Sequence, residues 1–177
     1  AVAAMKCNSI RVANIHMEEQ NIGDHHGWHH DGDSAQNRQG MLGIDKFFSS
    51  QVAYMLQKLD SSVDPEGGTM LDNSIVMYGK EMSNAGSNSI FGHVNDNSEV
   101  VLFGGLGGKI KTGQVIEYTN GRSLNQLLMS LMLAYGVQPT DWEINGAPGY
   151  GQYNAGMISD FKVVVDKRNP LPGFFKA

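Results

Sequence analysis

The stretch GDHHGWHHDGD, residues 23–33, places four of the six histidines of the chain within six consecutive positions. Imidazole nitrogens bind zinc and other transition metals, and they also exchange protons near neutral pH. Two pairs of histidines are four residues apart, His25 with His29 and His26 with His30. On a helix, each pair would share one face and could hold one ion. The residue types and their spacing therefore indicate a metal site or a proton-handling site.

The glycines of the same stretch make a regular helix unfavourable, and neighbouring imidazoles point apart in an extended chain. Four histidines therefore do not easily share one ion, and a site of two or three ligands with one carboxylate is more realistic. Three carboxylates are close in sequence: Asp24, Asp31 and Asp33. Mixed nitrogen and oxygen ligands suit zinc, manganese or iron. A hydrogen-bonded polar loop anchored by Trp28 accounts for the same residues, and the spacing alone leaves both interpretations open.

Two segments with the pattern of a strand each precede a long polar loop. Ile10–Met17 is apolar and β-branched, and the histidine stretch follows it. Ser74–Tyr78 is also apolar, and it precedes a loop that contains Glu81 and His93. If the two strands are parallel, both loops leave from one edge of the sheet, where α/β proteins bind ligands. We then expect Glu81 and His93 to lie near His25–His30.

The remaining patterns complete the expected architecture. Apolar residues at three- and four-residue steps predict helices over 44–59 and 124–135. Further strands are predicted at 99–105, 113–118 and 161–166, and a long loop at 18–43. The order strand, helix, strand, strand, helix is typical of an α/β domain with a mostly parallel sheet.

Composition excludes several classes of function. The chain has 177 residues, of which 41% are hydrophobic and 18% charged, as in soluble globular domains. A net charge of -5 leaves no basic stripe to neutralise phosphates, which argues against nucleic-acid binding. No apolar run approaches the roughly 20 residues that span a bilayer, so we expect no transmembrane segment. Any membrane contact would be peripheral.

Two other features indicate structure rather than chemistry. Cys7 is the only cysteine, which excludes an intrachain disulfide, and its apolar neighbours predict that it is at least half-buried. The stretch FGGLGGKIKTG is rich in glycine, but its spacing differs from that of a phosphate-binding loop, and Ile110 follows Lys109 where Ser or Thr is needed. We interpret it as a tight turn between strands.

Several motifs occur in an order that resembles a bacterial family of unknown function named for an HxxSHH motif. They are CNSIRVANIHM, HHGWHH, LDNSIVMYGKEMSN, VVLFGG, GKIKTGQVIEY and SLNQLLMSLMLAYGV, and the resemblance covers roughly residues 3–137. Members are typically exported and look like distant relatives of the alkaline phosphatase and sulfatase superfamily. The resemblance implies an α/β/α sandwich, metal-dependent hydrolysis of phosphate or sulfate esters, and a periplasmic or otherwise extracytoplasmic location.

The family's motif histidines correspond to His25, His29 and His30, and a loop histidine corresponds to His93. This chain departs from the family at three positions: Trp28 replaces serine, Asn95 stands nearest a second histidine, and Glu99 replaces proline. The resemblance implies a divalent metal, and the expected ligands are His25, His29, His30, His93, Asp31 and Glu81.

The resemblance covers only the carboxyl-terminal part of the longer family members. In the superfamily, the nucleophile and some metal ligands come from the amino-terminal half. We therefore expect residues 1–137 to be the carboxyl-terminal part of an alkaline-phosphatase-like domain, and residues 138–177 to be a Gly/Pro/aromatic-rich extension that packs on it or contacts a partner. The favoured function is a non-catalytic extracytoplasmic scaffold or accessory subunit that binds a protein partner in a larger assembly. The alternative is a metal-dependent phosphate or sulfate ester hydrolase that uses the histidine cluster.

Overall fold

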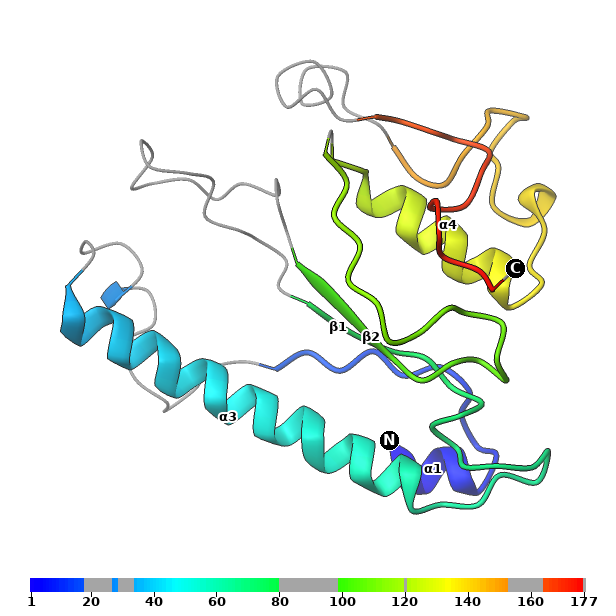
Figure 1. Ribbon diagram of the computed structural model, residues 1–177. Helices are drawn as coiled ribbons and strands as arrows, with labels where there is room; N and C mark the ends of the chain where they lie inside the picture. The colour runs from blue at the N-terminus through cyan, green and yellow to red at the C-terminus, as the bar shows by residue number, and fades with distance from the viewer. Residues whose placement is uncertain (18–26, 29–33, 80–98, 120, 153–163, 177) are drawn as a thin grey trace. The chain divides into compact units, whose positions relative to one another are not determined.

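The computed structural model describes residues 1–17, 27–28, 34–79, 99–119, 121–152 and 164–176 (Figure 1). The chain divides into two compact units, one formed by residues 1–71 with 84–95 and the other by residues 72–83 with 96–177. None of the helices in these described ranges has the length and apolar character needed to cross a membrane.

The first unit contains a short helix, α1 (Val2–Lys6), and a long helix, α3 (Ala35–Asp60). The predicted helix over 44–59 is confirmed, with Ile44, Val52 and Leu59 buried along one side. It begins earlier than expected because the Ser34 hydroxyl accepts a hydrogen bond from the Asn37 N–H at 3.0 Å and caps the first turn. The predicted loop was therefore wrong for residues 35–43, which are helical.

Two predictions for the amino-terminal segment were wrong. Residues 10–17 form no strand, and Val12 and Ile15 are 87% and 50% exposed. A strand needs a neighbour for its backbone hydrogen bonds, and no strand within the described ranges pairs with this segment. Cys7 is exposed because it follows directly on the end of α1, whose residues are themselves not buried.

The second unit contains the strands β1 (Val76–Gly79) and β2 (Val100–Phe103), both at predicted positions. They pair antiparallel, with Val76 opposite Phe103 and Gly79 opposite Val100. Residues 113–118 are described without a strand, and Val115 is 99% exposed. One antiparallel pair in the described ranges is too little to test the expected α/β/α sandwich, which stays a prediction.

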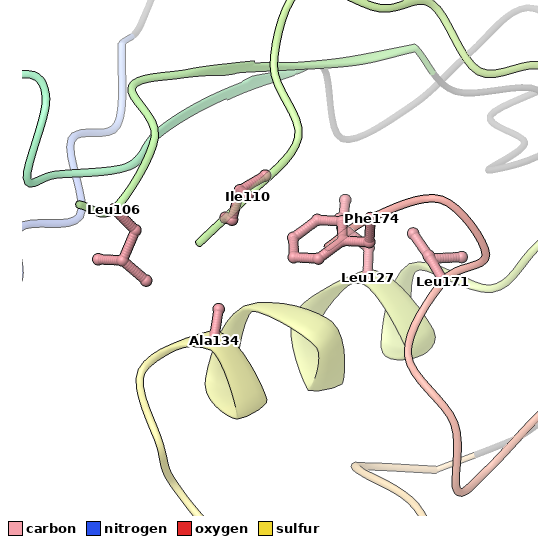
Figure 2. Close-up of a cluster of buried hydrophobic side chains, with 6 residues drawn as sticks. All are labelled: Leu106, Ile110, Leu127, Ala134, Leu171 and Phe174. Carbon is pink, nitrogen blue, oxygen red and sulfur yellow. The ribbon is translucent and has the colours of Figure 1, made fainter. Parts of the chain in front are cut away.

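Helix α4 (Leu124–Ala134) and the carboxyl-terminal segment build the core of this unit. The helix predicted over 124–135 is confirmed to within one residue. It ends where Gly136 adopts a φ of +84°, a conformation that favours glycine. Figure 2 shows α4 beneath side chains from the turn after β2 and from the chain end. The buried cluster consists of Leu106, Ile110, Leu127, Ala134, Leu171 and Phe174.

The carboxyl-terminal segment is fixed by backbone pairing. The Lys111 N–H donates to the Phe174 carbonyl at 3.0 Å, and the Lys176 N–H donates to the Lys109 carbonyl at 3.1 Å. Residues 164–176 include the buried Leu171 and Phe174, so this part of the segment packs on its own unit. The boundary at 137/138 stays a prediction.

A buried polar contact joins the same segment to α4. Ser130 is fully buried; its hydroxyl donates to the Gln126 carbonyl at 2.7 Å and accepts from the Leu171 N–H at 2.8 Å. The Gln126 side-chain Nε2 donates to the Asn169 carbonyl at 3.0 Å. Because buried backbone groups need partners, these two side chains hold residues 169–171 at one position along α4.

Candidate functional site

The predicted metal ligands all lie outside the described residues: His25, His29, His30, His93, Asp31 and Glu81. The described part of the histidine stretch is Gly27 and Trp28, which are helical. Within the described ranges, no group of three or more histidine, cysteine, aspartate and glutamate residues is arranged to hold a metal ion. The metal site stays a prediction.

Trp28 packs against helix α3 at Gly40. A Cβ atom at Gly40 would lie 2.7 Å from Cε2 of the indole ring, closer than real Cβ contacts allow. Glycine is unfavourable inside a helix, so a close approach by a large side chain accounts for its presence here. Gly43 on the same helix has nothing within 4 Å of the corresponding Cβ position. The contact agrees with the interpretation of Trp28 as an anchor.

A second aromatic residue, Trp142, follows the short 3-10 helix η1 (Pro139–Asp141). The Asp141 carboxylate accepts from the Gln138 N–H at 2.9 Å and closes this turn. The next residue, Glu143, accepts from the Gly149 N–H at 3.3 Å and so closes the loop that follows. Trp142 Nε1 is buried and has no hydrogen-bond partner.

Two cavities, each widely open to solvent, have Trp142 and Lys167 in common. The larger, about 210 Å³, has mostly apolar or glycine walls: Trp142, Ile144, Ala147, Pro148, Gly149, Gly151 and Lys167. The smaller, about 160 Å³, is lined by Met129, Pro139, Trp142, Glu143, Lys167 and Arg168. The described lining residues include no serine, cysteine or histidine, and their charged side chains are Glu143, Lys167 and Arg168.

A tight turn positions the two cations of this site. The Asp166 carboxylate accepts from the backbone N–H groups of Arg168 and Asn169, each at 2.9 Å. These hydrogen bonds, together with those from the Asn169 side chain, hold the pKa of Asp166 below its ordinary value. The carboxylate therefore stays ionised at neutral pH and keeps the turn that carries Lys167 and Arg168 closed.

In the glycine-rich turn after β2, the five consecutive N–H groups of residues 106–110 are already hydrogen-bonded within the chain. The Leu106 N–H donates to the Ser74 carbonyl at 3.4 Å and the Gly107 N–H to the Asp72 carbonyl at 2.9 Å. The next three N–H groups donate to carbonyls within the turn: those of Gly108, Lys109 and Ile110. The stretch forms a hydrogen-bonded turn, as interpreted, but the strand expected after it at 113–118 does not form, so the turn does not join two strands.

Sequence reasoning missed the cavities at Trp142. Their described residues come from α4, from η1 and the loop after it, and from the turn at Lys167. One signal was available, since a tryptophan and a glutamate stand directly before the glycine- and proline-rich stretch INGAPGYG.

Comparison with known protein families, curated proteins and solved structures finds no match to this chain.

Proposed function

We propose that the chain is a non-catalytic extracytoplasmic scaffold or accessory subunit that binds a protein partner within a larger assembly. The resemblance to an exported family supports the location, and the β1–β2 sheet supports the binding role. Side chains directly opposite each other on paired strands project to the same face of a sheet. Tyr78 therefore shares a face with Val101, and Val76 shares that face with Phe103.

The opposite face carries Val100 and Leu102, which pack against the buried cluster of Leu106, Ile110 and their neighbours. An antiparallel sheet with one face in water normally alternates apolar and polar residues. Here the face away from the cluster is also apolar: Val101 is 46% exposed on it, whereas Val76, Tyr78 and Phe103 are half-buried. The exposed Val101 on that apolar face is the single observation that carries the proposal, because burial against a partner would remove its side chain from water.

The test is affinity purification of the tagged chain from the cells that make it, followed by native mass spectrometry. We expect a stoichiometric protein partner that stays bound at high salt, since an apolar contact is not screened. Val101→Glu should release this partner. Val115→Glu is the matched control, because Val115 is 99% exposed and lies outside the sheet. A partner-free monomer would argue against the proposal.

Metal binding by the histidine segment is a separate proposal, which rests on the residue types and on the family resemblance. It leads to the alternative function, hydrolysis of phosphate or sulfate esters. Metal analysis of the purified chain tests it, with the variants His29→Ala and His30→Ala for comparison. Stoichiometric zinc, manganese or iron that is lost in both variants supports a metal site. Phosphatase and sulfatase assays with added zinc or manganese then test hydrolysis, and inactivity of the metal-loaded chain counts against it.

A further inference from the structure

The cavities at Trp142 combine features that suit one kind of ligand. Their volumes, about 210 and 160 Å³, lie below the roughly 300–1,000 Å³ of drug-sized sites, so the occupant is small. The larger cavity has apolar walls at Ile144, Ala147 and Pro148. Such walls fit a compact apolar group such as a single ring.

The smaller cavity supplies charge. Among its described lining residues are two cations, Lys167 and Arg168, and one carboxylate, Glu143. The Glu143 carboxylate already accepts a hydrogen bond from the Gly149 N–H. Guanidinium and ammonium groups form strong hydrogen bonds to carboxylates. Lys167 lines both cavities, and an anion beside it would lie next to the apolar walls.

Trp142 adds a donor that lacks a partner. Its Nε1–H is buried without a hydrogen bond, and such a group costs about 1–3 kcal/mol relative to a satisfied one. Unpaired buried donors are rare in native proteins. Trp142 lines both cavities, but its Nε1 is shielded from solvent, so this donor would reach a ligand oxygen only after the indole ring rotates.

We propose that Trp142, Lys167 and Arg168 form a binding site for a small carboxylate with an apolar group. The carboxylate lies at Lys167 and Arg168, and the apolar group occupies the cavity walled by Ile144 and Pro148. A free acid or the carboxyl terminus of a peptide would supply this chemistry. The site does not depend on the sheet contact proposed above, and its test is independent of partner capture.

The experiment uses tryptophan fluorescence. Trp28 and Trp142 are the two tryptophans of the chain, so Trp28→Phe leaves Trp142 as the only reporter. In this background, phenylacetate is titrated to about 10 mM, a range that detects a millimolar Kd. Phenylacetamide is the uncharged control. A tripeptide that ends in phenylalanine, with a free or an amidated carboxyl terminus, tests the second source.

We expect saturable changes in emission with phenylacetate and none with phenylacetamide. If the tripeptide with a free carboxyl terminus also binds, the ligand class includes peptide termini. If it does not bind, the class is restricted to small organic acids. Lys167→Met and Arg168→Met should each weaken binding about tenfold, while Lys111→Met, outside both cavities, should leave Kd unchanged. These exposed positions avoid loss of folding. Absence of saturation, equal binding of the amide, or insensitivity to both Met variants overturns the proposal.

Discussion

Trp28 is the aromatic residue of the histidine stretch, and Gly40 on α3 makes room for its ring. Gly40→Ala should displace the indole, because the new Cβ atom would overlap it. Gly43→Ala, three residues further along the helix, meets nothing and should raise the free energy of unfolding by about 0.5–1 kcal/mol. In a Trp142→Phe background, emission from Trp28 should shift to the red in Gly40→Ala only. Equal stabilisation and equal emission in both variants would show that the ring does not rest on Gly40.

A second prediction at this scale concerns Ser130. Ser130→Ala removes the acceptor of the Leu171 N–H and leaves that buried donor unpaired, so we expect a loss of about 1–3 kcal/mol in the free energy of unfolding. Ser49→Ala is the matched control. Its hydroxyl also donates to a carbonyl four residues earlier, but it is exposed and holds no distant segment. The measurement is urea unfolding of both variants. An equally small change in the free energy of unfolding in the two variants would contradict the role given to Ser130.

At the scale of elements, local patterns predicted the helices α3 and α4 and the strands β1 and β2, but they could not tell which strand-like segments find a partner. The apolar stripe of α3 and the serine caps of both long helices are set by residues close in sequence. A strand depends on a distant neighbour, and so Ile10–Met17, which has a strand's composition, forms none. For the same reason, the residues of the candidate site could be predicted only in part from the sequence. Residue types singled out Trp28, but only folding brings Trp142 beside Lys167.

A prediction about the elements concerns how much the carboxyl-terminal segment contributes to stability. Phe174 is 5% exposed, and it belongs to the buried cluster with Leu127 of α4. Phe174→Ala should lower the free energy of unfolding by about 3–5 kcal/mol, because it removes buried area and leaves a cavity. Phe47→Ala, at a side chain that is 44% exposed, should cost much less. Thermal unfolding followed by circular dichroism compares the two. A small effect at Phe174 would mean that the chain end does not contribute to the core.

At the scale of the whole molecule, charge decides which large partners the chain attracts. It carries 18 acidic and 13 basic residues, and a net charge of -5 repels the phosphate backbone. Non-specific DNA binding rests on phosphate neutralisation, which gives a Kd of about 10⁻⁴–10⁻⁶ M in proteins that have a basic surface. At low salt and about 10 µM protein, we expect no retardation of a duplex in a gel, whereas a basic protein of similar size retards it. A retarded complex that dissociates as the salt concentration rises would show that the chain has a local basic surface. It would contradict the exclusion of nucleic acid as a partner.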